Sequence, residues 1–477
     1  MRRIVTFLLS AFVAGSLPAG SAIFLHPDGT GLGHWNAARL LVAGPDGETH
    51  WDRLDRLAAY RPHQANWLST TSHAGATVHA YGHKVHYDSF GMDRDQPIRS
   101  LSGFDGSLLE EAAAEGLRTG LVNSGHIAEP GTAVFVAPSD DREKVLEISA
   151  KVVGSGTDVI FAGGEVFLLP EGETGFFGRE GLRKDGRNLL EEAREAGYRV
   201  IHTREELLLL PDDTEKVLGV FAPGHTFNDQ TETFLAAADL PDYLPGAPSI
   251  GEMTAAALRI LGSDPERDFL LVAEEEGTDN FSNHNNARGM LKAVVRADQA
   301  VGVALRFLAE QPDRETFLLV GSDSDAGHPT VYAPRDADDD YRLPERDDNG
   351  APVDGIDGAG GVPFVSLPDT RGNRHPFGIA WATRYDFPGS VVTKAHGPGS
   401  GRLGSSLDNT GIYRLLYLAL FNREPGEKAP APKADTLPER TKAGAGGRAE
   451  ETGGAEDEGK GGGDGGPGPE DDRAEMP

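Results

Sequence analysis

The chain of 477 residues contains no cysteine. This absence excludes disulfide bonds, thiolate metal sites and cysteine nucleophiles together, so any bound metal must use oxygen or imidazole ligands. Basic residues are also scarce, because 75 Asp and Glu face 45 Lys and Arg and the net charge is −30. Such a charge repels nucleic-acid phosphates and anionic lipid surfaces. A nucleic-acid scaffold is therefore not an expected partner.

Long apolar runs are lacking except at the N-terminus. Residues 1–22, MRRIVTFLLSAFVAGSLPAGSA, combine a basic start, an apolar run and small residues. This pattern predicts a signal peptide and export to the periplasm or out of the cell. A buried first strand behind an irregular leader is the alternative, because AIFLHPDG follows directly. No other stretch reaches the ~18 apolar residues of a membrane span, so none is expected.

Short apolar runs alternate with amphipathic segments along residues 23–423. Strand-like AIFL, DVIFAGG and FLLVAEEE alternate with helical patterns such as SLLEEAAAEG and ARGMLKAVVRADQAVGVALRFLAE. This alternation favours an α/β fold, a three-layer sandwich with a mainly parallel central sheet covered by helices on both faces. Functional side chains are expected just past the carboxyl ends of the strands. That is where HPDGTG, EEEGTDNF and GSDSDAG place acidic residues.

Two segments depart from this rhythm. Residues 333–376 are rich in Asp, Gly and Pro and lack a helical or strand period, which predicts a long loop or cap near the site. Its aspartates from Asp336 to Asp357 lack EF-hand spacing, so a solvated acidic loop is favoured over a calcium loop. Residues 424–477 are poor in apolar residues and rich in Gly, Pro and Glu. We expect this tail to be disordered, because burial cannot offset its ordering entropy.

Residues 66–85, NWLSTTSHAGATVHAYGHKV, place Ser72 at the start of a helical pattern rich in small residues. A helix N-terminus favours an anion and helps to ionise a hydroxyl, which makes Ser72 a candidate nucleophile. An ordinary N-cap serine is the alternative. His79 and His83 have the i,i+4 spacing that can bind metal, but no further ligands lie nearby in the sequence, so no metal site is expected there.

Six motifs follow one another in a recognisable order: DGTG, the serine helix ending in GHK, DVIFAGG, GTDNFSNH, GSDSDAG and GPGSGRLGSSLDNTGIYRLL. With them the chain resembles a bacterial alkaline phosphatase over roughly residues 22–422. The resemblance implies a metal-dependent hydrolase of small-molecule phosphate monoesters that works through a phosphoserine, and a homodimer, since the family often dimerises. The residues agree with that chemistry, which needs divalent cations, a positioned nucleophile and a cationic clamp.

The resemblance assigns the two catalytic side chains. Ser72 is implied to become phosphorylated, and Arg142 in APSDDREK is implied to grip two phosphate oxygens with its planar fork. A solvated charge early in a helix is the alternative for Arg142. The family usually has an acidic residue just before this serine, but Thr71 stands there, so phosphate positioning is expected to differ.

The resemblance also implies a set of metal ligands. Asp28 matches a carboxylate that bridges two metals, Asp279 matches the aspartate of the first catalytic site, and Glu129 lies near a third metal, usually magnesium. The remaining implied ligands are Glu274, His284, Asp323, Asp325 and Asp386.

Two of the acidic assignments stay open. Glu274 matches the family's magnesium glutamate, but Glu275 and Glu276 follow it, and strand alternation puts Glu274 and Glu276 on the same face. The family's hydroxyl ligand two residues after Glu129 is Gly131 here, with Thr132 next to it. That site is therefore altered or shifted by one residue.

The family's histidine ligands are largely replaced. Four residues after Asp279 the chain has Asn283, and we favour His284, one residue later, as the ligand. Ser324 replaces the histidine after Asp323, and the distal histidine aligns on Asp386. The alternative is that His126 or His328 replaces the lost imidazoles in space.

Oxygen ligands thus dominate the implied centre. Such ligands favour magnesium, with calcium or manganese as alternatives, and leave zinc to a site near His284. Two other functions remain open: a phosphodiesterase on the same scaffold, and a non-catalytic, divalent-cation-binding exported protein. A sulfatase is not expected, because HAGA follows Ser72 instead of the C/S-x-P-x-R motif.

Overall fold

The computed structural model describes residues 20–335 and 341–426, so most of the predicted tail and most of the predicted signal peptide lie outside the described residues. The first strand, β1, already begins at Ser21. Ser21 and Ala22 are buried within it, and the backbone N–H of Gly20 donates to the carbonyl of Ala419 at 3.1 Å. The predicted leader boundary at residue 22 therefore falls inside β1, because the apolar leader runs into the strand without a spacer.

A ten-stranded sheet forms the centre of the fold, in the order β15-β2-β14-β8-β1-β7-β3-β4-β6-β5. Its strands are β1 (Ser21–Pro27), β2 (Arg56–Arg61), β3 (Arg118–His126), β4 (Val159–Gly163), β5 (Arg199–Ile201), β6 (Val217–Val220), β7 (Phe269–Glu275), β8 (Thr316–Val320), β14 (Val392–His396) and β15 (Ser406–Asp408). Only β14 pairs antiparallel, with β2 and β8, among the described strands of this sheet. The predicted α/β fold with a mainly parallel sheet is confirmed.

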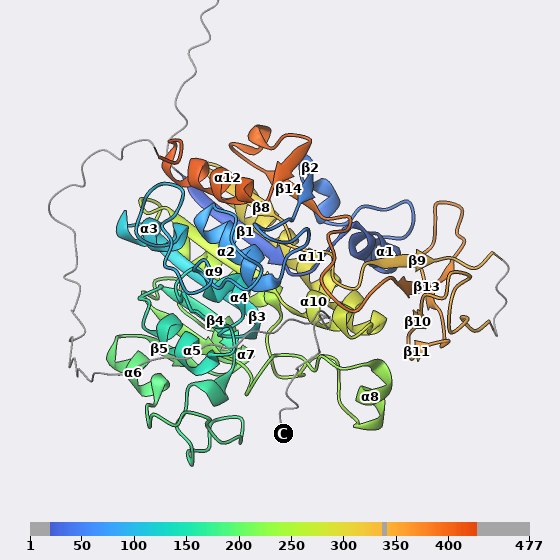
Figure 1. Cartoon of the computed structure of the whole chain (residues 1–477), viewed down its shortest axis with the longest axis horizontal. Helices are drawn as coiled ribbons and strands as arrows, with labels where there is room; N and C mark the ends of the chain where they lie inside the picture. Colours follow the sequence, from blue (N-terminus) through green and yellow to red (C-terminus); the bar gives the residue numbers. More distant parts are fainter. Residues whose placement is uncertain (1–19, 336–340, 427–477) are drawn as a thin grey trace, which may run out of the picture. The chain divides into compact units, whose positions relative to one another are not determined.

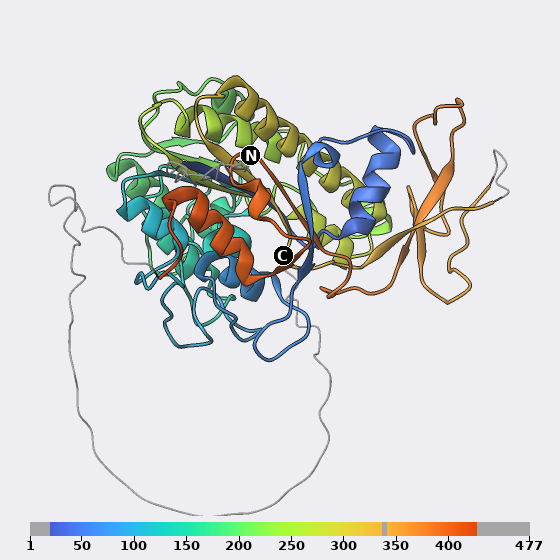
Figure 2. The same cartoon turned by 90° about the horizontal axis from the view of Figure 1, so that it is seen from above.

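Helices cover both faces of this sheet (Figures 1 and 2). Neighbouring side chains of β1 enter opposite cores: Phe24 packs in the core that contains Tyr413 of α12, and Ile23 in the core that contains Met290 of α11. On the α12 side lie α2 (Ser72–Tyr81), α3 (Leu108–Ala114), α5 (Val145–Val153), α6 (Leu189–Glu195) and α12 (Thr410–Phe421). On the α11 side lie α1 (Leu32–Val42), α9 (Ile250–Leu261) and α11 (Ala287–Glu310). This is the predicted three-layer arrangement.

Shorter helices sit in the connections: α4 (Pro130–Ala133), α7 (Arg204–Leu208), α8 (Glu232–Ala237) and α10 (Gly277–Asn283). Single 3₁₀ turns span Trp51–Arg53, Glu165–Phe167 and Ser400–Arg402. Within residues 20–335 and 341–426, no helix combines the length and the apolar character that a membrane crossing requires.

A second, antiparallel sheet of short strands lies partly within the segment that we expected to be a long loop, and most of the described residues of that segment lie outside its strands (Figure 1, orange). It contains β9 (Pro329–Tyr332), β10 (Val353–Gly355), β11 (Gly358–Ala359), β12 (Phe364–Val365) and β13 (Pro376–Trp381). Three of these strands are only two or three residues long, too short to show a period of two in the sequence. The indole N–H of Trp381 donates to a buried carboxylate oxygen of Asp354 at 2.7 Å and ties β13 to β10.

A buried glutamate beside this small sheet gives a test of stability against pH. Glu232 opens α8, is 2 % exposed, and accepts a hydrogen bond from the backbone N–H of Arg288 at 3.1 Å. Burial, together with the Asp354 carboxylate, raises the pKa of Glu232 from 4.5 to about 8. Between these two pH values the folded protein holds a proton that the unfolded chain releases, so the stability due to this proton is lost as the pH rises.

We therefore expect Glu232→Gln, which cannot ionise, to lose less stability than the wild type between about pH 5 and pH 8. The difference in the free energy of unfolding should reach roughly 4 kcal/mol at the upper end. Urea unfolding across this range measures it. Parallel curves for the two proteins would contradict the assignment.

Candidate functional site

Buried carboxylates gather where three adjacent parallel strands end. Asp28 follows β1, Asp323 follows β8, and Asp279 lies in α10 directly after β7. Because β1 pairs with both β7 and β8, the three side chains meet at one edge of the sheet. They are at most 6 % exposed. The acidic side chains expected past the strand ends thus lie together at this edge of the sheet.

The first group at this edge is Asp28, Asp323 and His26, which could hold a metal ion together. His26 Nε2 lies 3.7 Å from Asp28 Oδ1 and 3.9 Å from Asp323 Oδ1, and its Nδ1 lies 3.3 Å from Glu274 Oε1. The His26 side chain is fully buried, and neither ring nitrogen has hydrogen-bond geometry to a partner among the described residues. Buried polar atoms normally have such partners, so this arrangement fits a bound cation.

The sequence did not point us to His26, although a signal was present. It stands two positions before Asp28 in LHPDG, and side chains two apart on a strand share a face. Because it interrupts an apolar run, a histidine there needs a polar partner. It places an imidazole beside Asp323, where Ser324 has replaced the family's histidine.

The second group contains Asp279, Asn283 and Asp386. Asn283 Nδ2 lies 3.0 and 2.9 Å from the two carboxylate oxygens of Asp279 and 3.4 Å from Asp386 Oδ1. Burial and the neighbouring charges of Asp386 and Asp28 raise the pKa of Asp279 well above its usual range. These contacts favour Asn283 over His284 as the third member. His284 lies one residue further on, at the C-cap of α10.

The three consecutive glutamates separate onto two faces, as strand alternation predicts. Glu276 lies within ligand distance of Asp28 and Asp279, and Glu274 lies beside His26. Glu275 points away, where its Oε1 accepts hydrogen bonds from Ser124 Oγ at 2.9 Å and the Tyr243 hydroxyl at 2.8 Å. Glu274 and Glu276 both face the centre, whereas Glu275 does not.

Glu274 is surrounded by the segment that follows β3. The amide of Asn123 donates to Glu274 Oε2 and to Thr132 Oγ1, the latter at 2.9 Å. A Cβ atom at Gly131 would stand 1.7 Å from Glu274 Oε1, so the carboxylate packs directly against that glycine. Burial raises the pKa of Glu274 to about 7. The hydroxyl of Thr132, and not residue 131, is thus the one near this carboxylate.

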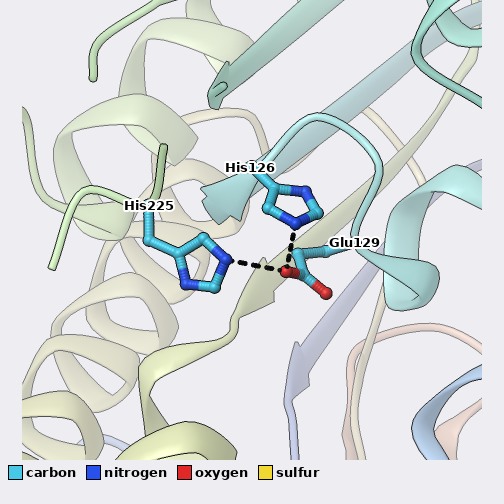
Figure 3. Close-up of side chains that lie close together, drawn as sticks. All are labelled: His126, Glu129 and His225. Carbon is cyan, nitrogen blue, oxygen red and sulfur yellow. Dashed lines mark ion pairs between the residues drawn. The ribbon is translucent and has the colours of Figure 1, made fainter. Parts of the chain in front are cut away.

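Glu129 is the N-cap residue of α4, and its carboxylate lies between the imidazole rings of His126 and His225 (Figure 3). Each imidazole Nε2 is 3.0 Å from Glu129 Oε1. Burial alone would raise the pKa of Glu129, but His126 and His225 hold it well below its usual range. His225 was not expected from the sequence, because it comes from a distant loop between β6 and α8.

Asp325 forms hydrogen bonds with neighbouring side chains and backbone and does not join the other predicted ligands. Its Oδ2 accepts hydrogen bonds from Ser390 N at 2.7 Å and Ser390 Oγ at 3.1 Å, and it lies 2.8 Å from His328 Nδ1. His34 Nδ1 is 3.5 Å from its Oδ1. The structure does not bring Asp325 into the metal-compatible groups of the described residues, and His328 lies against Asp325.

The carboxylates around this centre cannot all be charged without cations. Burial raises the pKa values of Glu276, Asp279, Asp323 and Asp386. Buried like charges at this density are stable only when neutralised. Oxygen donors prevail, which fits magnesium, manganese or calcium, while His26 adds one imidazole to the group of Asp28 and Asp323. The donor atoms therefore fit divalent cations.

The serine helix begins directly above this centre. Thr71, not Ser72, is the N-cap of α2, because the Thr71 hydroxyl accepts the Ala74 N–H at 3.3 Å. Ser72 is the first helical residue and is 8 % exposed. A Cβ atom at Gly75 would stand 2.5 Å from Asp323 Cβ, so the first turn of α2 packs on the carboxylate centre.

Arg142 reaches the same helix end. Its Nη1 lies 3.3 Å from Nδ1 of His73, the residue after Ser72, and its side chain is 44 % exposed. Burial and the guanidinium charge hold the pKa of His73 well below its usual range, so His73 is neutral and can accept a hydrogen bond. The Arg142 guanidinium thus lies at the helix N-terminus that packs on the carboxylates.

Known proteins are similar to this chain in sequence and in fold. The sequence profile of the alkaline phosphatase family matches residues 20–338. Repressible alkaline phosphatase of Saccharomyces cerevisiae is 30% identical over 288 residues, which are 57% of this chain and 48% of the yeast protein. The matched region thus spans about half the length of that relative. Streptomycin-6-phosphate phosphatase of Streptomyces griseus is 29% identical over 364 residues, 68% of this chain and 77% of that protein.

Solved structures agree on the fold. Alkaline phosphatase of Thermus thermophilus superimposes with a TM-score of 0.65 at 22% identity, covering 88% of this chain and 96% of that one. A variant of the alkaline phosphatase from the Antarctic bacterium TAB5, with Mg bound in its M3 site, gives 0.62 at 19% identity over 84% and 98% of the chains. With the profile match covering most of its length, the chain belongs to the alkaline phosphatase family.

Proposed function

We propose that this protein is an exported, metal-dependent phosphomonoesterase that forms a phosphoserine at Ser72. The observation that carries the proposal is the packing of the first turn of α2 on Asp323. This contact supports the proposal, because the helix turn that begins with Ser72 lies against carboxylates that require cations. Membership of the alkaline phosphatase family supports the same chemistry.

Two groups of residues would hold the catalytic cations: His26, Asp28 and Asp323, and then Asp279, Asn283 and Asp386. Glu274, Glu276 and Glu129 extend the carboxylate cluster behind them. Bound divalent cations would supply Lewis-acid stabilisation of phosphate oxygens and lower the pKa values of bound alcohol and water.

The chain's own residues account for the remaining steps. The Ser72 oxygen attacks phosphorus, the bond from phosphorus to the substrate alcohol breaks, and the alcohol leaves with a proton. Arg142 binds two of the non-bridging oxygens, and the N–H groups of α2 hold the third. Water then attacks the phosphoserine and releases inorganic phosphate and the serine hydroxyl.

Replacing Arg142 tests its proposed role in binding the phosphate oxygens. We expect Arg142→Ala to lower kcat/KM for p-nitrophenyl phosphate by roughly 10²-fold and to weaken inhibition by inorganic phosphate, because both bind through the same oxygens. Lys144→Ala is the matched control, since Lys144 pairs at the surface with Asp140 at 2.6 Å. Unchanged phosphate inhibition in Arg142→Ala would remove Arg142 from the site.

The substrate class is tested by comparing p-nitrophenyl phosphate with bis(p-nitrophenyl) phosphate. A monoesterase should prefer the first, because Arg142 and the N–H groups of α2 engage three non-bridging oxygens and a diester has only two. Preference for the diester would favour the phosphodiesterase. Cation binding without hydrolysis of either ester would favour the non-catalytic alternative.

We also propose that the protein is exported and forms a homodimer. The basic and apolar N-terminal pattern supports export. Secretion of the full chain with cleavage near residue 20 would agree with β1 starting at Ser21. Sedimentation of the purified protein decides between monomer and dimer.

A further inference from the structure

The residue that follows the proposed nucleophile is a buried histidine in contact with Arg142. His73 is the second residue of α2 and is 8 % exposed. Its Nδ1 atom lies 3.3 Å from Nη1 of Arg142. A guanidinium group carries only N–H donors, so a hydrogen bond between them requires a lone pair on Nδ1. The imidazole is therefore neutral and carries its proton on Nε2.

Thr71 demands the same tautomer from the other side of the ring. The Thr71 hydroxyl donates its single proton to the backbone carbonyl of Tyr87 at 2.6 Å. Its oxygen accepts the Ala74 N–H at 3.3 Å and also lies 3.3 Å from Nε2 of His73. Because the hydroxyl proton is already used, the proton between Thr71 and His73 belongs to Nε2. Both polar contacts of the ring thus leave Nδ1 as the acceptor.

The neutral ring is also favoured electrostatically. Burial, together with the Arg142 charge, holds the pKa of His73 well below its usual range. A neutral acceptor orients the guanidinium without cancelling its positive charge, whereas a carboxylate at this place would compete with a phosphate for it. The contact uses one N–H of Nη1, so N–H groups of both Nη atoms stay available for phosphate oxygens.

Arg142 needs such a support because the rest of its surroundings are open. Its side chain is 44 % exposed, and its Nε lies 3.6 Å from Oε1 of Glu143, whose side chain is 81 % exposed. Exposed ion pairs of this kind contribute little, and a free arginine side chain loses rotamer entropy when it is held in one orientation. The contact with buried His73 is therefore the one that can fix the guanidinium beside Ser72.

We propose that His73 is a positioning residue, which Thr71 holds in its Nε2–H tautomer and which orients Arg142 toward the oxygens of a phosphate at Ser72. This inference rests on the proposed phosphomonoesterase function and extends it to a side chain that acts only through Arg142. Thr71 stands where the family usually has an acidic residue. In this chain, a series of neutral hydrogen bonds would thus orient the arginine.

Binding of inorganic phosphate to the Mg²⁺-loaded full chain, measured by titration calorimetry, tests the proposal. His73→Leu removes the acceptor at similar size, and His73→Asn keeps one, because its amide oxygen can replace Nδ1. His83→Leu is the matched control, since His83 is exposed just beyond α2. We expect the Kd for phosphate to rise about tenfold in His73→Leu and to stay within about threefold of the wild type in the other two.

The same replacement in the Arg142→Ala background separates positioning from a general loss of structure. If His73 acts through Arg142, His73→Leu should change the phosphate Kd by less than about twofold once the arginine is gone. An equal loss with and without Arg142, or an unchanged Kd in His73→Leu, would overturn the proposal.

A measurement on the wild type does not depend on how the variants fold. Nitrogen NMR of the histidine rings, with the His73 signals identified by their loss in His73→Asn or His73→Leu, should show a proton on Nε2 and none on Nδ1. A proton on Nδ1 would overturn the proposal. Failure of the wild type to hydrolyse p-nitrophenyl phosphate would instead overturn the proposed function, and the phosphate titrations would still decide the role of His73.

Discussion

Ser72→Ala is expected to lower kcat for phosphate monoesters by roughly 10⁴-fold or more, because removal of a covalent nucleophile eliminates the reaction path. The fold should be retained, since Thr71 and not Ser72 caps α2. Metal content should also be retained, because the carboxylates and His26 stay in place. Steady-state hydrolysis of p-nitrophenyl phosphate and metal analysis of the same preparation measure both effects.

Thr71→Ser is the matched control for this change. It keeps the hydroxyl that accepts the Ala74 N–H, so it should stay within a few-fold of the wild type. Activity of Ser72→Ala close to that of the wild type would remove the serine from the mechanism.

Removal of the cations should abolish activity and lower stability. The buried acidic side chains have raised pKa values, so without cations they must bind protons or repel one another. Each saturated site adds about 2.7 kcal/mol to the free energy of unfolding at 100 times its Kd. We expect Mg²⁺ or Mn²⁺ to restore both hydrolysis and thermal stability, because oxygen ligands dominate.

Zinc added alone should restore less hydrolysis and less thermal stability than Mg²⁺ or Mn²⁺. The reason is that the group of Asp279, Asn283 and Asp386 offers oxygen ligands and an amide in place of the family's imidazoles. The experiment adds each cation singly and in pairs to stripped protein. Full recovery with zinc alone would show that the histidines near the centre outweigh the carboxylates and would overturn this ligand assignment.

The fold was predictable because its main strands are continuous apolar runs. Ile23 and Phe24 of β1 are both fully buried, which is the expected signature of a strand covered on both faces. The small sheet of β10, β11 and β12 was not predictable. Its strands are held by pairing with neighbours and by the contact between Trp381 and Asp354, and neither leaves a local pattern.

The candidate site was predictable where a rule of topology applies. Asp28, Asp279 and Asp323 come at strand ends, and parallel strands bring their ends to one edge. The choice between Asn283 and His284 depended on the side-chain contacts in α10, which sequence spacing cannot supply. Of the predicted ligands, Asp325 is drawn to His328 and Ser390 by contacts across the fold.

His26 is a candidate ligand that the sequence alone could not identify. A single histidine within an apolar strand carries little signal alone, and its meaning depends on Asp323, which is almost 300 positions away in the chain. The same holds for His225, whose partner Glu129 precedes it by nearly a hundred residues. Such pairs become visible only once the sheet order is known.

The most direct test of the central claim is to trap the covalent intermediate. The wild-type protein, with its cations bound, is mixed with p-nitrophenyl phosphate, quenched in acid within a turnover, digested and examined by mass spectrometry. The account predicts a phosphoryl group on Ser72 in the wild type and none in Ser72→Ala. Turnover without a phosphopeptide, or a phosphoryl group on another residue, would contradict it.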